Sequence, residues 1–325
     1  MAHSDPVLVV EAAVTGIQLS AFLERALPNV HRLQLRRLVS AGRVRVNGEV
    51  WLASRRLRAG DVVQVPTPAP ASTNVRSAAA PPLPEVLFES AHTLVVAKPA
   101  GLPTVPDRSG RERGVHGLLA DLRPAADLRI VHRLDRDTSG CLVLAKGVRA
   151  AQHFDEQFRR RLVRKTYVAL VHGVPHRESF AIDAGIGPDR RRPGKVVTGD
   201  ERTSGFRSAH TDVIRRRAFR RHALLELLPA TGRGHQLRVH LQSVGHPIVG
   251  DLDYGGERLL LSSLKSGYKL QVGATERPLV DRMFLHCERI GFVDLDGAAV
   301  AAESTLPADL AMVLQKIEGF DERRR

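Results

Sequence analysis

Cysteine, long apolar runs and glycine-rich phosphate loops are scarce or absent in this sequence. Only two of its 325 residues are cysteine, Cys141 and Cys287, so neither a disulfide framework nor a zinc site built from cysteines is possible. No apolar run reaches the ~18 residues of a membrane-spanning helix, and the first residues do not have the pattern of a secretory signal. No G-x-G-x-x-G or Walker-type loop indicates a nucleotide cofactor. We therefore expect a soluble, cytoplasmic protein.

Positive charge is what the sequence has in excess. Lysine and arginine outnumber aspartate and glutamate by 49 to 35, which gives a formal net charge of +14. An arginine-rich composition alone would raise these counts, but the excess falls in clusters, and clustering favours a nucleic acid as the partner. The clusters are Arg159–Lys165, Arg190–Arg192, Arg215–Arg221 and Arg323–Arg325.

The first part of the chain, residues 1–66, has the pattern of a small independent domain. Apolar residues at helical spacing predict helices over 19–27 and 33–41. Arg43–Gly48 alternates like a strand and ends in Asn-Gly, which is a strong hairpin signal, and residues 57–65 predict a further turn and strand. The sequence therefore predicts two helices and a small sheet.

A linker and a larger domain follow. Residues 67–82 are rich in proline, alanine and serine and have no periodic apolar pattern, as is typical of a linker. In residues 83–325, strand patterns far outnumber crossover helices, which predicts a mixed, mostly antiparallel sheet with helices packed on it, an α+β fold. The expected strands include 93–97, 141–146, 164–172, 209–215, 222–228, 283–287 and 290–295, and the expected helices are 150–158, 237–244 and 307–317.

The polar stretch Val131–Gly140, which runs into the apolar strand 141–146, contains the best candidate for chemistry. Asp135 follows an apolar residue and has arginines close by on both sides, which can pair with a partly buried carboxylate. Most loop aspartates only cap turns or face water. Asp137–Gly140 has turn chemistry, so we interpret Asp137 as structural and Asp135 as the candidate catalytic residue.

A second stretch, Thr231–Leu241, places the glycine-flanked Arg233 at the start of a predicted helix, where its charge could meet Asp135. Histidines in both stretches raise the alternative of a metal site. His240 follows His235 by five residues, so the two point to different faces of a helix. We therefore expect these histidines to form structural hydrogen bonds, and we expect no metal.

These motifs together resemble a known enzyme family. HRLDRDTSG at 132–140, TGRGHQLRVHL at 231–241 and GHPIVGD at 245–251, with the weaker KPAGL at 98–102 and KTYVALVHG at 165–173, resemble the RluA-type family of RNA pseudouridine synthases. Residues 1–66 are similar to the small RNA-binding domain named after ribosomal protein S-four. The resemblance implies a long bent sheet with the catalytic loop in a central cleft.

The resemblance also implies a role for each site residue. Asp135 would attack the sugar carbon or remove the neighbouring proton, with Arg233 as its ion-pair partner. Tyr167 would stack on the base, and its hydroxyl could serve the late proton transfer. Arg133 would fill the space that a flipped-out uridine leaves. Because the isomerisation involves no redox change or group donor, no cofactor is expected.

Alternatives remain open at this point. Asp135 and Asp137 could be the carboxylate pair of a hydrolytic glycosidase, although adjacent loop residues rarely converge on one substrate. The chain could also be a non-catalytic RNA-binding or ribosome-assembly factor.

The expected partner is RNA. Besides the cleft, the resemblance implies RNA contacts in the first domain, for which Arg36, Arg37, Arg43 and Arg45 are the candidates, because rows of arginine can neutralise successive phosphates. Such a second contact is most useful on a large folded RNA, so we expect large-subunit ribosomal RNA, with transfer RNA as the alternative. We expect the protein to act as a monomer.

Overall fold

The structure is a computed structural model. It describes residues 7–27, 35, 38–39, 42–51, 55–65, 83–106, 114–123, 125–265, 268, 270 and 275–322. The chain divides into two compact units, Met1–Ala80 and Pro81–Arg325. The whole predicted linker, together with Arg36 and Arg37, lies outside the described residues.

The first unit contains a small sheet with strand order β1-β4-β2-β3, and helix α1 supplies buried side chains to the same core. The predicted first helix and Asn-Gly hairpin are confirmed, and Asn47 and Gly48 both have the positive φ that this turn requires. Most of the second predicted helix lies outside the described residues. The elements are β1 (Val7–Val9), the 3-10 helix η1 (Ala12–Val14), α1 (Leu19–Ala26), β2 (Arg45–Val46), β3 (Glu49–Val50) and β4 (Val62–Gln64).

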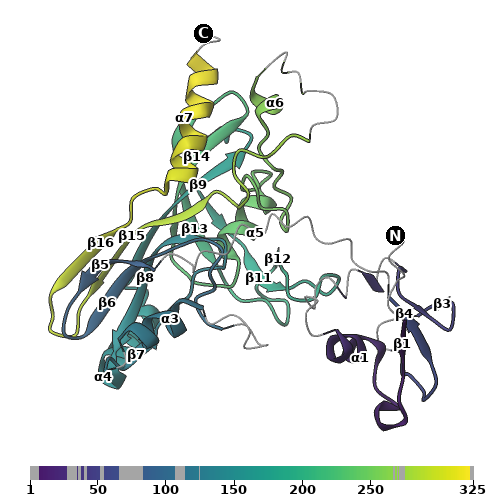
Figure 1. The fold of residues 1–325 in the computed structure, drawn as a ribbon. Helices are drawn as coiled ribbons and strands as arrows, with labels where there is room; N and C mark the ends of the chain where they lie inside the picture. Colours follow the sequence, from purple (N-terminus) through teal and green to yellow (C-terminus); the bar gives the residue numbers. More distant parts are fainter. Residues whose placement is uncertain are drawn as a thin grey trace. The chain divides into compact units, whose positions relative to one another are not determined.

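The second unit is built on a ten-stranded sheet (Figure 1). Its order is β10-β13-β14-β9-β15-β8-β6-β5, with β16 paired to β15 and β7 to β8. All pairs are antiparallel except β8 with β15, which confirms the predicted mixed, mostly antiparallel α+β fold. The strands are β5 (Glu85–Glu89), β6 (Thr93–Lys98), β7 (Leu128–Ile130), β8 (Ser139–Lys146), β9 (Arg164–His172), β10 (Ser179–Asp183), β13 (His210–Ala218), β14 (His222–Pro229), β15 (Leu285–Val293) and β16 (Ala299–Glu303).

The helices of the second unit pack beside this sheet. Helices α3 and α4 lie together near β7, and α7 lies at the opposite end of the unit in Figure 1. Phe154 on α4 is fully buried, as its apolar spacing predicts. No helix in the described part of the chain is both long and apolar enough to cross a membrane. The helices are α3 (Gly114–Leu122), α4 (Gly147–Arg159), α5 (Gln236–Ser243), α6 (Leu261–Leu264) and α7 (Ala308–Glu322).

The prediction of two strands over 283–287 and 290–295 is wrong. A single strand, β15, crosses this region, and its register against β9 shifts between Cys287 and Arg289. This irregularity accommodates Glu288 within the strand, and its carboxylate accepts two hydrogen bonds from Arg216 at 2.9 and 2.5 Å. Glu288 and Arg289, the polar pair that interrupts the apolar pattern, are therefore part of the strand.

The prediction of a turn over Asp137–Gly140 is also wrong. The turn lies two residues earlier, where the amide of Thr138 donates to the carbonyl of Asp135 at 3.1 Å. Gly140 belongs to β8 and pairs with Cys287 of β15, with φ at +112°. A Cβ there would lie 2.1 Å from the carbonyl oxygen of Cys287, so the glycine is required by the close approach of two strands.

Candidate active site

A cleft of about 1040 Å³ in the second unit brings together the residues that the sequence singles out. The loop before β8 contributes Arg133 and Asp135, β9 contributes Tyr167, and the turn before α5 contributes Arg233. Leu285 of β15 is a further lining residue. Residues far apart in sequence therefore meet at the point where β8, β15 and β9 lie side by side.

The loop that carries Asp135 is fixed on both sides of this residue. On one side, the Thr104 hydroxyl donates to the carbonyl of Leu134 at 2.9 Å and accepts from its amide at 3.1 Å. On the other side, the buried ammonium of Lys98 donates to the carbonyl of Arg136 at 2.9 Å. Asp135 is thus held between two anchors, so its carboxylate has a defined position in the cleft.

Lys98 belongs to the KPAGL motif, and its supporting role was not predicted. Its ammonium also donates to the carbonyls of Pro99 and Leu102, each at 2.8 Å. Burial lowers the pKa of Lys98 to about 7. Only the ammonium form has the three N–H groups that three carbonyls need, so this arrangement favours the charged lysine.

In the structure the ion-pair partner of Asp135 is Arg238, whereas the resemblance predicts Arg233. Arg238 Nη1 lies 3.3 Å from Asp135 Oδ2. Arg233 instead donates through Nε to the carbonyl of Ser208 at 3.1 Å. Arg233 lines the cleft, but its guanidinium is occupied elsewhere.

Arg238 is itself held by a fully buried carboxylate. Its Nε and Nη2 each donate to Asp251 at 2.7 Å, and its guanidinium lies 4.8 Å from the centre of the Tyr254 ring. Burial opposes the charged form, but the hydrogen bonds and charge of Asp251, together with the charge of Asp135, raise the pKa of Arg238 above its ordinary value. Asp251 is the last residue of the GHPIVGD motif, so this motif supplies the carboxylate that holds Arg238.

The local sequence explains why Arg238 points inward. Gln236 begins helix α5, and its side-chain oxygen accepts from the amide of Arg233 at 3.0 Å and from the hydroxyl of Thr231 at 2.8 Å. These bonds fix the glycine-rich turn outside the helix. Every residue from 236 to 241 is buried, so Arg238 lies on a helix without an exposed face. An arginine between two buried apolar residues is the signal that could have identified it.

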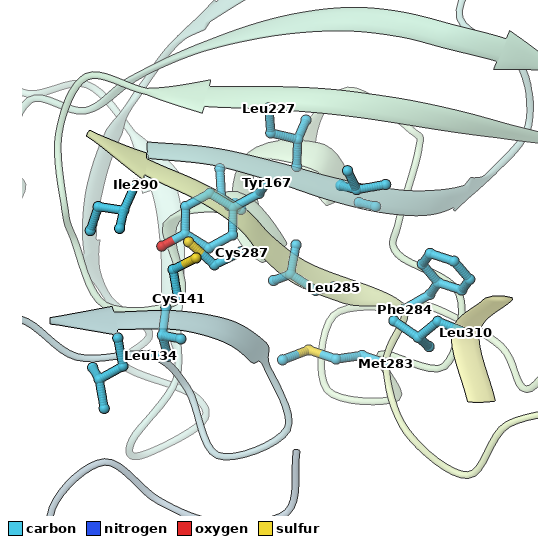
Figure 2. Close-up of a cluster of buried hydrophobic side chains, with 14 of the residues drawn as sticks. Leu134, Cys141, Tyr167, Leu227, Met283, Phe284, Leu285, Cys287, Ile290 and Leu310 are labelled. Carbon is cyan, nitrogen blue, oxygen red and sulfur yellow. The ribbon is translucent and has the colours of Figure 1, made fainter. Parts of the chain in front are cut away.

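Tyr167 lies on β9 between β14 and β15. Figure 2 shows its hydroxyl beside the thiols of Cys141 and Cys287. Burial is the main cause that raises the pKa of Tyr167 well above its ordinary value, and the neighbouring Cys287 thiol adds to this effect. Tyr167 lines the cleft, and the hydroxyl that the predicted late proton transfer would use lies beside the two buried thiols.

Comparison with known proteins identifies the family. A family model described as RNA pseudouridylate synthase matches residues 92–243, and a model of the S4 domain matches residues 19–63. A protein of Chloroflexus aurantiacus named as an uncharacterized RNA pseudouridine synthase is 38% identical over 97% of this chain and 94% of its own length. The chain belongs to the RNA pseudouridine synthase family. It is therefore an isomerase, as the motifs predict.

Two further relatives and one solved structure extend this result. The ribosomal large subunit pseudouridine synthase C of Vibrio cholerae is 35% identical over 87% of both chains, and that of Escherichia coli is 32% identical over 97% of both. The solved structure named human RNA pseudouridylate synthase domain containing 4 has 28% identity and a TM-score of 0.55, covering 72% of this chain and 92% of that one. The relatives cover both units of the synthase.

The three histidines of the two main motifs form hydrogen bonds within the fold. His132 Nε2 accepts from the amide of Val143 at 2.9 Å, and His235 Nδ1 is 2.8 Å from the hydroxyl of Tyr254. His240 is fully buried and is hydrogen-bonded through both ring nitrogens. Among the residues that the structure describes, no group of three histidine, cysteine, aspartate or glutamate side chains is arranged to hold a metal ion.

We expect the stability of the fold to fall at acid pH because of His132. Burial lowers its pKa to about 3, so in the folded synthase it binds fewer protons below pH ~6.5 than in the unfolded chain. Stability is therefore complete above pH ~6.5 and is lost as the pH falls toward 3. At pH 5 we expect His132 to cost roughly 2 kcal/mol of unfolding free energy relative to pH 7.

Urea unfolding at pH 7 and pH 5 measures this effect. His132→Gln should lose less stability between the two pH values than the wild type, while replacement of the exposed His176 by glutamine should not alter the difference. Equal pH dependence in His132→Gln and wild type would show that His132 is not the source.

The cleft is strongly basic. Seven basic and three acidic side chains line it, which suits a polyanionic substrate. Burial lowers the pKa of one of them, Lys165, whose ammonium lies 5.9 Å from the Phe158 ring centre. The basic residues are Arg133, Arg136, Arg159, Arg161, Lys165, Arg233 and Arg238, and the acidic ones are Asp135, Asp137 and Asp253.

Not every predicted basic cluster faces the cleft. Arg215–Arg221 lies where β13 turns into β14, at the opposite end of β14 from the cleft and roughly 25 Å away along the strand. Three of its arginines pair within the fold, with Glu178, Glu226, Glu288 and Glu318. This cluster therefore supports the sheet. Arg323–Arg325 lies outside the described residues.

Proposed function

We propose that this synthase isomerises uridine in large-subunit ribosomal RNA, with Asp135 as its catalytic residue. The observation that carries the proposal is the carboxylate of Asp135, paired with Arg238 in a basic cleft that Tyr167 also lines. The relatives in Vibrio cholerae and Escherichia coli, which are named for the large ribosomal subunit, support the choice of RNA.

The reaction needs one well-placed carboxylate. The bond between N1 and the sugar carbon breaks, the uracil turns, C5 bonds to the same carbon, and the proton on C5 is finally lost while N1 gains one. Asp135 either attacks the sugar carbon or takes the neighbouring proton, and both routes begin with its charged form. Arg238 aims this carboxylate, and the Tyr167 ring stacks on the base. No step requires an electron carrier or a group donor.

Arg133 is placed to assist substrate entry. It is exposed at the cleft beside the Asp135 loop. An internal uridine can reach Asp135 only after it leaves its stack, and a guanidinium in the vacated space lowers the cost of that step. In the first unit, Arg43 and Arg45 are exposed and would contact RNA phosphates, together with Arg36 and Arg37.

A direct test compares ribosomal and transfer RNA. Both RNAs from a strain that lacks the enzyme would be incubated with the pure protein, and pseudouridine would be mapped at single-nucleotide resolution. New sites in large-subunit ribosomal RNA support the proposal. New sites only in transfer RNA would replace it with the alternative target, and no new site in any RNA would favour the non-catalytic binder.

The first unit should matter only on large substrates. Two linked contacts gain affinity through effective concentration, so a protein that begins at Pro81 should lose on the order of ten- to a hundredfold in kcat/KM on a long ribosomal RNA fragment. On a minimal stem-loop, which the second unit engages alone, we expect less than a twofold change. The loss on the fragment should shrink with added salt, because the intact protein's extra phosphate contacts weaken.

A control separates RNA binding from folding. The variant Arg43→Ala/Arg45→Ala keeps the first unit but removes two exposed cations, so it should reproduce part of the loss on the fragment. Undiminished modification of the long RNA by the truncated protein would contradict the targeting role.

A further inference from the structure

A hairpin outside the predicted catalytic set reaches the charge network of the active site. Strands β11 (Gly185–Pro188) and β12 (Val196–Gly199) form this hairpin, and Lys195 ends its connecting turn. The ammonium of Lys195 forms an ion pair with Asp253 Oδ2. The same oxygen lies 3.2 Å from Arg238 Nη2. Lys195 and Arg238 therefore share one carboxylate oxygen.

The hairpin is fixed against the residues that surround this oxygen. The amide of Val196 donates to the hydroxyl of Tyr254 at 3.1 Å, and Arg192 Nη1 donates to the carbonyl of Asp253 at 3.1 Å. Tyr254 is fully buried, and the Arg238 guanidinium lies over its ring. These contacts give Lys195 a defined place beside Asp253.

Arg238 is divided among three carboxylates. Asp251 takes the two short hydrogen bonds at 2.7 Å. Asp135 and Asp253 hold Arg238 only weakly, at 3.3 and 3.2 Å. Asp253 therefore competes with Asp135 for the guanidinium, and its strength as a competitor depends on how well its charge is neutralised.

Lys195 supplies that neutralisation. Burial opposes the charged form of Asp253, but the hydrogen bond and charge of Lys195, with Arg238, lower its pKa below the ordinary value. Without Lys195, Asp253 would draw Arg238 more strongly and would add an unbalanced negative charge near Asp135.

We propose that Lys195 is a positioning residue for catalysis: by occupying Asp253, it keeps the Arg238 guanidinium directed at Asp135. The inference rests on the proposed role of Asp135. The effect of Lys195 passes through Asp253 and Arg238 to the catalytic carboxylate, so the hairpin would contribute to catalysis and not only to the positive charge near the cleft.

The experiment measures kcat and KM separately. Lys195→Met keeps the aliphatic stem and removes the charge, and we expect kcat to fall about tenfold with KM changed less than threefold. Lys195→Arg should recover most of the loss. In the Asp253→Asn background, the same Lys195→Met change should lower kcat less than twofold, because the competing carboxylate is no longer charged.

Arg191→Ala is the matched control. It removes a cation from the same hairpin, where the side chain is exposed, and so should leave kcat unchanged and act only on KM. If Lys195→Met behaves like Arg191→Ala, Lys195 is only a phosphate contact and the inference is wrong. An equal loss of kcat in the Asp253→Asn background would also overturn it.

A crystal structure of Lys195→Met provides a readout without activity. Arg238 Nη1 should have moved away from Asp135 Oδ2 toward Asp253, and an unchanged distance would contradict the inference. Failure of the wild-type protein to form pseudouridine would be a failure of the proposed function, and the structural comparison would still decide the role of Lys195.

Discussion

Asp135→Asn will abolish pseudouridine formation while the protein stays folded and bound to RNA. The amide has the shape of the carboxylate but can neither attack the sugar carbon nor take a proton. We expect kcat to fall at least ~1,000-fold, which corresponds to about 4 kcal/mol in the barrier. Arg238 keeps its two 2.7 Å bonds to Asp251, so the fold should tolerate the change.

RNA affinity separates this result from a structural failure. A single neutral amide barely alters an interface of many phosphate contacts, so the Kd for RNA should stay within a few-fold. Asp137→Asn, on the same loop and in the same cleft, is the control and should lower kcat less than tenfold. Equal losses from both variants would point to a carboxylate pair, and parallel losses of binding and activity would point to a structural Asp135.

Arg238→Lys should have the second largest effect, although it keeps the charge. A lysine cannot hold Asp251 with two parallel bonds and also reach Asp135, because all its N–H donors are on one nitrogen. We expect kcat to fall about 100-fold. Because the Asp251 side chain is only 1% exposed, its incomplete pairing should also cost roughly 3 kcal/mol of stability. Kinetics below the melting temperature, with circular dichroism for folding, would measure both effects.

Arg233→Lys is the comparison that decides between the two arginines of the motif. Arg233 bonds to a backbone carbonyl at the edge of the cleft, so we expect less than a tenfold effect, mostly on KM. A greater loss of kcat from Arg233→Lys than from Arg238→Lys would restore Arg233 as the partner of Asp135 during the reaction.

The elements that sequence reasoning predicted best are those with a strong local pattern. Strand 164–172 was predicted with the bounds it has, because a central strand covered on both faces reads as a continuous apolar run. The hairpin at Asn47-Gly48 depends on a turn that few other residues adopt. Asp135 and Tyr167 were identified through motif resemblance, and the fold brings them into one cleft.

The errors arise where distant contacts decide the outcome. Arg233 and Arg238 lie in one motif, and only the burial of α5 shows which of them faces Asp135. The β11–β12 hairpin was not predicted because its glycines interrupt any strand pattern. The structure needs these glycines: a Cβ on Gly187 would lie 2.8 Å from the ring of Phe206. Sequence pattern alone does not record such close approaches.

The place of β15 in the sheet sets the order in which the enzyme can be made. This strand lies between β8 and β9, yet it follows both of them in the chain by more than a hundred residues. During synthesis, the half-sheet next to Asp135 and the half-sheet that carries Tyr167 must wait, each with an unpaired edge, until residues 285–293 have emerged. Unpaired edges invite association between chains, so the nascent protein is most prone to aggregation during this interval. The catalytic cleft is therefore completed only after β15 has been made, long after Asp135 and Tyr167.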